Sequence, residues 1–224
     1  MGQVFDAHLH NKNHESGGFL IGLEGVPHFE GTLDNKEVMK LHDPSNDYFS
    51  FYYMMANEVQ NRKRIDHSLL KYHPRREGYS PDAVDASIAL NHPKVAIIDT
   101  LNEPFWYAYD YWNIARHNPN VAFIMTHSGG YLINDFLKIC HFQPNVWIDF
   151  ALTHTVLGGL GNRTAGLAYV CDGIRFALHS PFRNRILLGS DYPFYDQDEV
   201  FEYYSDYLNL LNDNYLQFVE ENIK

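Results

Sequence analysis

The chain alternates short apolar runs with segments of helical periodicity. Runs such as Val95-Ala96-Ile97-Ile98 are apolar on both faces, which is typical of parallel strands covered by helices. Eight runs predict strands, at Gln3–His8, Gly18–Leu23, Tyr48–Met54, Ser68–His73, Lys94–Thr100, Val121–His127, Asn145–Phe150 and Ile186–Asp191. The segments between them predict helices at Asn35–His42, Ala56–Ile65, Pro81–Asn91, Phe105–His117, Tyr131–Cys140, Thr164–His179 and from about Gln197 to Asn222.

This succession of strands and helices predicts an α/β fold, a (β/α)₈ TIM barrel. The structural rival is an open doubly wound sheet, which predicts a glycine-rich phosphate loop after the first strand. The first strand is followed instead by His-Asn-Lys-Asn-His at residues 10–14. Because the chain has 224 residues and such barrels typically have about 250, we expect a compact barrel with short helices and loops.

Histidines stand at the end of the first predicted strand. Asp6, His8 and His10 alternate along it, so they are expected on one side, with the histidines nearest the carboxyl end. Imidazoles two residues apart can share a metal ion, and barrel active sites lie at this end. With 13 histidines in the chain, however, such a pair also arises by coincidence.

Two other predicted strands also end in residues that carry chemistry. The sixth is followed by the run that begins with His127, and the eighth ends at Asp191. Both residues are expected at the same mouth of the barrel as His8 and His10. Imidazoles and a carboxylate suit Zn²⁺, and an open coordination position would hold a water molecule. Asp191 suits two tasks, binding the metal and accepting a proton from that water.

These motifs resemble the metal-dependent amidohydrolase superfamily, and within it the amidohydrolase-2 branch that includes aminocarboxymuconate-semialdehyde decarboxylase-like enzymes. The resemblance rests on Asp6-Ala7-His8-Leu9-His10, Thr126-His127-Ser128-Gly129-Gly130 and Gly189-Ser190-Asp191-Tyr192-Pro193, in the expected order along the chain. It implies that His8, His10 and Asp191 bind a metal and that His127 orients or protonates the substrate.

The fifth predicted strand departs from the pattern of that family. Its members usually place a metal-binding histidine there, in an Ile-His-Thr-Gly-like run, whereas this chain has Asp99 at the corresponding position. An aspartate can bind Zn²⁺ or Mn²⁺. Three alternatives stay open: Asp99 is a ligand, His127 takes its place, or the metal is weakly bound or absent.

The fourth predicted strand supplies candidates for substrate binding. Lys71 and His73 lie on one face of it, and Arg75 and Arg76 follow in the loop above. Some family members use a carbamylated lysine on this strand to bridge two metals, but a lysine inside the barrel can equally bind a substrate carboxylate. Lys71, His73 and Arg75 therefore predict an anionic small-molecule substrate, although loop arginines are more often merely solvated.

Charge and composition limit the partners. Seventeen basic and 28 acidic residues give a formal charge of −11, which disfavours nucleic acid and anionic membranes. There is no secretory signal pattern and no apolar run long enough to span a bilayer. Cys140 and Cys171 are expected to be free buried thiols. We therefore expect a single cytoplasmic domain over residues 1–224, compatible with a homo-oligomer.

The resulting functional hypothesis is a metal-dependent hydrolase that uses a metal-activated water on a small ester, lactone or amide. Two alternatives stand beside it. One is a metal-dependent non-oxidative decarboxylase of a small carboxylic acid, because the resembling branch contains both activities. The other is a catalytically inactive barrel that acts as a binding module.

Overall fold

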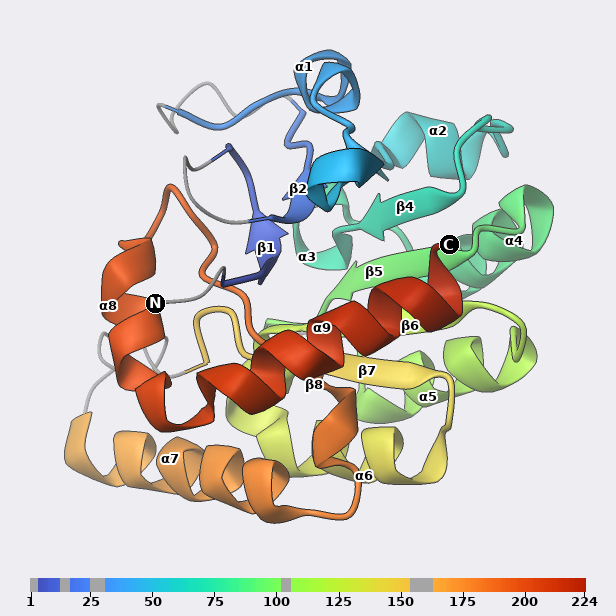
Figure 1. The fold of residues 1–224 in the computed structure, drawn as a ribbon. Coiled ribbons are helices and arrows are strands. Elements are labelled where there is room, and N and C mark those ends of the chain that lie inside the picture. The colour runs from blue at the N-terminus through green and yellow to red at the C-terminus, as the bar shows by residue number, and fades with distance from the viewer. Residues whose placement is uncertain (1–3, 13–16, 25–30, 102–105, 154–162) are drawn as a thin grey trace.

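Eight parallel strands, each hydrogen-bonded to the next in chain order, form the core of the molecule (Figure 1). The computed structural model describes residues 4–12, 17–24, 31–101, 106–153 and 163–224, without the side chains of residues 163–167. The strands are β1 Asp6–Leu9, β2 Gly18–Ile21, β3 Tyr48–Tyr53, β4 Leu69–Tyr72, β5 Val95–Asp99, β6 Ala122–Thr126, β7 Val146–Asp149 and β8 Ile186–Leu187.

Backbone hydrogen bonds join the first strand to the chain that follows the last one. The amide of Ala7 donates to the carbonyl of Leu188 at 2.7 Å, and the amide of Asp191 donates to the carbonyl of His8 at 2.9 Å. These bonds bring β1 against the β8 segment and close the sheet. The predicted (β/α)₈ TIM barrel is confirmed.

Helices cover the outside of the sheet. They are α1 Asn35–Lys40, α2 Ala56–Gln60, α3 Pro74–Glu77, α4 Pro81–Asn91, α5 Ala108–His117, α6 Ile133–Phe142, α7 Arg163–His179, α8 Gln197–Tyr203 and α9 Leu208–Asn222. Among the described residues between β1 and β2 there is no helix, which is one way this short chain completes a barrel. No described helix combines the length and the apolar character that crossing a bilayer requires.

Alternation along β5 divides its apolar residues between two clusters. On β5, Val95 and Ile97 belong to the cluster that fills the barrel, whereas Ala96 and Ile98 belong to the cluster between the sheet and the helices. A strand that is apolar on both faces therefore buries both faces, as its sequence predicts. The inward-facing series on β5 ends at Asp99, which places this carboxylate at the mouth of the barrel.

The C-terminal helix α9 closes the opposite end of the barrel. Tyr215, Phe218 and Val219 belong to the same cluster as the inward-facing strand residues. The Phe218 ring lies 5.6 Å from that of Phe19 on β2 and 5.0 Å from that of Trp147 on β7. In Figure 1 this red helix crosses the barrel rather than lying parallel to its strands.

Three predictions about helices need correction. The continuous helix expected over Gln197–Asn222 is broken by a 3₁₀ turn at Ser205–Tyr207, because α8 packs outside the barrel whereas α9 turns across its floor. The second helix ends at Gln60 rather than Ile65, and Arg62 has a left-handed backbone conformation with φ 51°. The predicted loop that carries Arg75 begins with the short helix α3.

The two cysteines are free thiols, as expected. Cys140 is buried, but Cys171 is only partly so, because its helix α7 lies on the outside of the barrel. Burial raises the pKa of the Cys140 thiol to about 12.

Candidate metal centre

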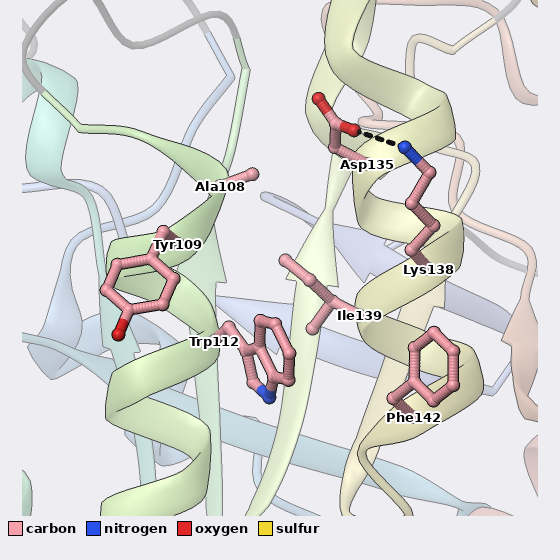
Figure 2. Close-up of a pocket in the computed structure, with 7 residues that line it drawn as sticks. All are labelled: Ala108, Tyr109, Trp112, Asp135, Lys138, Ile139 and Phe142. Carbon is pink, nitrogen blue, oxygen red and sulfur yellow. Dashed lines mark hydrogen bonds and ion pairs between the residues drawn. The ribbon is translucent and has the colours of Figure 1, made fainter.

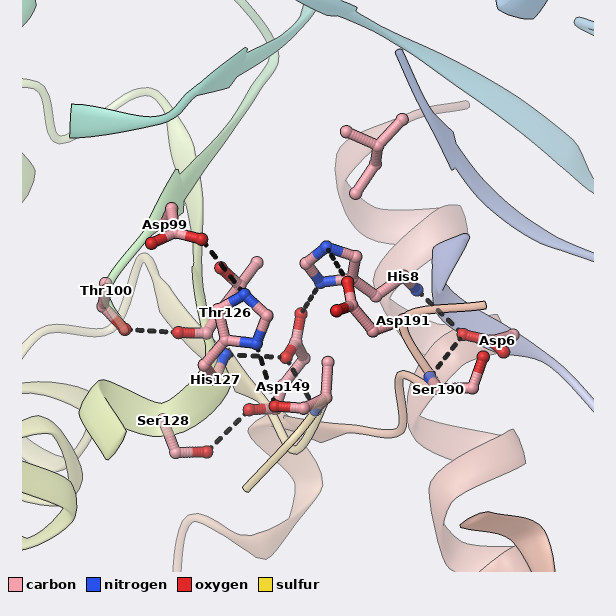
Figure 3. Close-up of polar contacts among 12 residues, drawn as sticks. Asp6, His8, Asp99, Thr100, Thr126, His127, Ser128, Asp149, Ser190 and Asp191 are labelled. Atoms are coloured by element: carbon pink, nitrogen blue, oxygen red, sulfur yellow. Dashed lines mark hydrogen bonds and ion pairs between the residues drawn. The ribbon is translucent and has the colours of Figure 1, made fainter. Parts of the chain in front are cut away.

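The carboxyl ends of the strands bring together the site residues that the sequence predicts. Potential metal-ligand atoms of His8, His127 and Asp191 all lie within 4.8 Å of one another, although these residues come from β1, the end of β6 and the segment after β8. His10 joins them, since its Nε2 atom lies 3.1 Å from Oδ1 of Asp191. All four side chains are buried at the mouth of the barrel, and Figure 3 shows His8, His127 and Asp191 of this group.

A register irregularity in β1 helps to bring its histidines to this place. The pairing of β1 with β2 shifts between Asp6 and Leu9, and such irregularities re-aim side chains near active sites. Asp6 itself does not reach the cluster. Its carboxylate accepts hydrogen bonds from the backbone amides of His8 and Ser190, at 2.9 and 3.0 Å, and therefore ties β1 to the segment after β8.

Two of the histidines donate from Nδ1 to backbone carbonyls. His10 Nδ1 lies 3.0 Å from the oxygen of Ile21, and His127 Nδ1 lies 2.9 Å from the oxygen of Ala151. Because a carbonyl oxygen only accepts, each Nδ1 atom carries the hydrogen. Both rings therefore present Nε2 to the carboxylates of the cluster.

His8 has the same orientation, but its partner is a carboxylate. Its Nδ1 atom lies 3.1 Å from Oδ2 of Asp149, and its Nε2 atom lies 3.2 Å from Oδ1 of Asp191. With its single hydrogen on Nδ1, each of the His8 and His10 rings directs the lone pair of Nε2 at a carboxylate oxygen of Asp191. Because the Nε2 lone pairs and the carboxylate oxygen are all hydrogen-bond acceptors, a cation bound between them would interact favourably with each.

The distances also suit a divalent metal. Ligand atoms placed 2.0–2.1 Å from a tetrahedral zinc ion lie roughly 3.3 Å apart, close to the 3.1 and 3.2 Å that separate Asp191 Oδ1 from the two Nε2 atoms. Three carboxylates, those of Asp99, Asp149 and Asp191, are buried at this mouth together with the amino group of Lys71. A cation bound among them would improve the charge balance.

Burial and neighbouring charges set the protonation of the cluster. Burial lowers the pKa of His8 well below its usual value, so its ring is neutral. Burial alone would raise the pKa of Asp191, but His8, His10 and His127 outweigh that effect and hold it below the ordinary range. Burial also opposes protonation of His127, yet Asp99 outweighs it and the pKa of His127 is raised. Asp191 is therefore an anion at neutral pH.

Asp99 contacts two imidazoles. Its Oδ2 atom lies 3.1 Å from Nε2 of His127 and 3.4 Å from Nε2 of His73. Burial would raise its pKa, but these two histidines and Lys71 hold that pKa well below the ordinary value. The carboxylate is therefore an anion beside His127.

Backbone geometry at the ends of β6 and β8 is unusual. His127 has φ 60° and Asp191 has φ 65°, a left-handed conformation that non-glycine residues rarely adopt and that clusters at functional sites. The His127 amide donates to Oδ1 of Asp149 at 2.9 Å, which holds this turn. Gly189 allows a close approach nearby, because a Cβ atom there would lie 2.6 Å from Cβ of His8.

The predicted substrate-binding residues lie beside Asp99. Lys71 is buried, and its Nζ atom donates to Oγ1 of Thr126 at 3.4 Å. His73 is mostly buried, and burial lowers its pKa to about 3 despite Asp99. Arg75 is 42% exposed, with Nε 4.0 Å from Oδ1 of Asp99. The structure thus places an ammonium and a guanidinium next to the candidate metal site.

Arg76 is directed elsewhere. Its Nη2 atom donates to the backbone carbonyl of Glu24, and its guanidinium lies over the ring of Tyr53. This arginine ties α3 to the chain that follows β2.

Asp149 is the residue that the sequence signals too weakly. Asp149 is the last residue of β7, just as Asp99 is the last residue of β5, and this position predicts a side chain at the mouth of the barrel. No histidine motif accompanies Asp149, however. The structure shows it in contact with His8 and with the backbone of His127. The run Asn102-Glu103-Pro104 follows the fifth predicted strand and His154 follows the seventh, which makes them further candidates for the mouth, but they lie outside the described residues.

Apolar grooves also occur away from this mouth. One lies between α5 and α6 and is lined by residues that include Tyr109, Trp112 and Phe142 (Figure 2). A second lies between α6 and α7 and includes Phe142, Phe176 and Phe182. Neither lining includes the clustered histidines, so the grooves are distinct from the candidate metal centre.

The model of the amidohydrolase family matches residues 107–210, a segment that includes His127 and Asp191. The predicted resemblance to amidohydrolases is confirmed. No protein with a curated description matches this amidohydrolase-like chain.

Solved structures are similar in fold. One is an uncharacterized TIM-barrel protein from Bordetella bronchiseptica, with TM-score 0.62 and 15% identity over 90% of this chain and 76% of its own. Another is a candidate 2-pyrone-4,6-dicarboxylic acid hydrolase from Pseudomonas putida, with TM-score 0.59 and 12% identity over 99% of both chains. At these identities the likeness establishes the fold of the amidohydrolase-like barrel.

Proposed function

We propose that this protein is a metal-dependent hydrolase that cleaves a small ester, lactone or amide. The observation that carries the proposal is the arrangement of Asp191, whose Oδ1 atom faces Nε2 of His8 and of His10 at 3.2 and 3.1 Å while each ring holds its Nδ1 hydrogen elsewhere. The family match supports an amidohydrolase.

We propose that His8, His10 and Asp191 hold one divalent ion, with His127 or Asp99 completing the site. Imidazole and carboxylate ligands favour Zn²⁺, and Mn²⁺ is compatible. When bound, such an ion supplies Lewis acidity, which makes water a better nucleophile at neutral pH and polarises a carbonyl.

The side chains then divide the work of hydrolysis. Asp191, an anion in its buried position, accepts a proton from the attacking water as the water oxygen bonds to the carbonyl carbon. His127, whose pKa is raised, donates a hydrogen bond to the oxygen on which negative charge develops. The bond to the leaving oxygen or nitrogen breaks, and that atom takes up the proton, so the products are an acid and an alcohol or amine.

We propose an anionic substrate, bound by Lys71, His73 and Arg75. Lys71 and Arg75 offer positive charge beside the cluster, and Arg75 is exposed enough to meet an incoming ligand. The substrate named for the Pseudomonas putida neighbour is a dicarboxylic acid, which agrees with this charge. On the sequence grounds given above, we also propose a single cytoplasmic domain.

Non-oxidative decarboxylation is the second candidate. The observation that favours it is the contact of Asp99 with His127, because this pairing keeps a proton on a buried imidazole. In that reaction the bond between the substrate carbon and its carboxylate breaks, CO₂ leaves, and the imidazole protonates the carbon.

The proposal is tested by metal content together with product analysis. We expect purified protein to bind about one Zn²⁺ or Mn²⁺ per chain, to release acid from a panel of carboxylated lactones, esters and amides, and to lose that activity on chelation. Release of CO₂ from unsaturated or aromatic acids, without acid release from the esters, would establish the decarboxylase instead.

Histidine variants provide the control. His8→Ala is expected to lose the metal and at least a hundredfold of activity, whereas His141→Ala, an exposed histidine on α6, should retain both. If the wild-type protein binds no stoichiometric metal and turns over no substrate, the protein is a binding module and the hydrolase proposal fails.

A further inference from the structure

Asp149 forms hydrogen bonds to two strands at once. Its Oδ2 atom lies 3.1 Å from Nδ1 of His8, and its Oδ1 atom accepts from the backbone amides of His127 and Ala151, each at 2.9 Å. The side chain is fully buried, and Figure 3 shows it between His8 and His127. One carboxylate thus links the end of β7 to β1 and to the end of β6.

These contacts determine the direction of the His8 ring. An ionised carboxylate can only accept, so Nδ1 carries the hydrogen and the lone pair is on Nε2, the atom that faces Asp191. His10 and His127 donate instead to neutral carbonyls. At Nδ1, His8 alone among these three rings has a carboxylate partner, and such a partner fixes the tautomer and the orientation of a metal-binding imidazole.

The second oxygen acts on His127 through the backbone. His127 has the left-handed φ of 60°, and its amide hydrogen bond to Asp149 helps to hold that conformation. The same oxygen holds Ala151, whose carbonyl accepts from Nδ1 of the His127 ring. Asp149 therefore fixes both the turn and the acceptor that orient this imidazole.

We propose that Asp149 is a positioning residue that fixes His8 as the tautomer with hydrogen on Nδ1 and holds His127 at the same time, so that both imidazoles present Nε2 to the site. As far as metal binding is concerned, this inference rests on the proposed metal-dependent function. The tautomer itself can be measured in metal-free protein.

Asp149→Asn gives a sharp test because it preserves the shape of the side chain. The amide oxygen can still accept from His127 and Ala151, but the amide nitrogen now donates to Nδ1 of His8, which moves the ring hydrogen to Nε2. In metal-free protein, ¹⁵N NMR of the ring nitrogens should show hydrogen on Nδ1 of His8 in the wild type and on Nε2 in the variant. Zinc affinity should fall roughly ten- to a hundredfold.

Asp6→Asn is the matched control. Asp6 is an equally buried aspartate on β1 that accepts from backbone amides and from Gln197, and no imidazole contact is found for it among the described residues. It should leave the His8 tautomer and zinc affinity near wild-type values. Thermal unfolding of both variants establishes that each is folded.

The outcomes separate the two proposals. Hydrogen on Nε2 of His8 in the metal-free wild-type protein, or an unchanged tautomer in Asp149→Asn, overturns the role of Asp149. Equal zinc affinity in the wild type and in Asp149→Asn overturns the proposed effect of Asp149 on metal binding. If the wild-type protein binds no metal but the tautomer inverts as expected, the metal proposal fails and the positioning role stands.

Discussion

Asp99 occupies the position at which the resembling family carries a histidine, and its contacts indicate how the site works without one. Oδ2 of Asp99 lies 3.1 Å from Nε2 of His127, whereas the potential ligand atoms that converge within 4.8 Å belong to His8, His127 and Asp191. We therefore expect Asp99 to act through His127 rather than as a ligand.

Asp99→Asn tests this expectation. The amide removes the negative charge that raises the pKa of His127, so activity should fall by about a hundredfold or more, within the range typical of a lost acid–base contribution. Metal content, measured by mass spectrometry of the element, should stay near that of the wild type. Asp191→Asn, measured in parallel, should lose both the activity and the bound metal. If Asp99→Asn loses as much metal as Asp191→Asn, Asp99 is a ligand instead.

Single residues also show what the sequence can predict about the site. His8, His10, His127 and Asp191 could be predicted because they end strands that are recognisable from their apolar patterns. The partnership of His8 with Asp149 could not, because it spans 141 positions and depends on how each strand end is turned. A sequence pattern places a side chain at the mouth, but it does not determine which imidazole nitrogen faces inward.

Among the elements, α9 has the largest structural role outside the sheet. Its apolar side chains fill the floor of the barrel, so the helix supplies part of the core. The helical spacing of the apolar residues in this part of the chain predicted a packing face. The break between α8 and α9 could not be predicted, because it depends on the direction in which each half meets the barrel.

Phe218→Ala tests the role of the floor. The ring is fully buried against Phe19 and Trp147, so its removal should lower the free energy of unfolding by about 3–5 kcal/mol, measured by urea denaturation. Leu216→Ala, at an exposed position of the same helix, should change it by about 0.5 kcal/mol or less. A loss in Phe218→Ala as small as that expected for Leu216→Ala would show that α9 is not part of the core.

For the whole molecule, the outer face of α5, α6 and α7 stands apart from the rest of the surface. Phe142 is 66% exposed and Phe176 61% exposed, beside the two apolar grooves that flank α6. Although the chain carries a charge of −11, the described side chains of these helices include equal numbers of acidic and basic residues: Asp110, Asp135, Asp172, Arg116, Lys138 and Arg175. A second copy of the chain would therefore meet apolar surface there without net repulsion.

We expect this face to support self-association. Sedimentation velocity should detect a dimer of the wild-type protein whose fraction rises with concentration, and Phe142→Glu should shift it to monomer because the new charge would be buried in the interface. Leu216→Glu places the same charge on exposed α9 and should leave the dimer intact. A wild-type protein that stays monomeric at every concentration would contradict the expectation.

The meeting of β1 with the segment after β8 has a consequence for how the protein is made. His10 and Asp191 are 181 positions apart, and at roughly 5–20 residues per second a ribosome takes about 10–40 s to synthesise the chain between them. During that interval the histidines have emerged without the carboxylate of Asp191, and the first strand has β2 but not yet the segment after β8 as a neighbour. The ion that we propose for this centre would therefore be captured only late in synthesis or after release, so ion supply then, rather than during early translation, should determine how much protein is loaded.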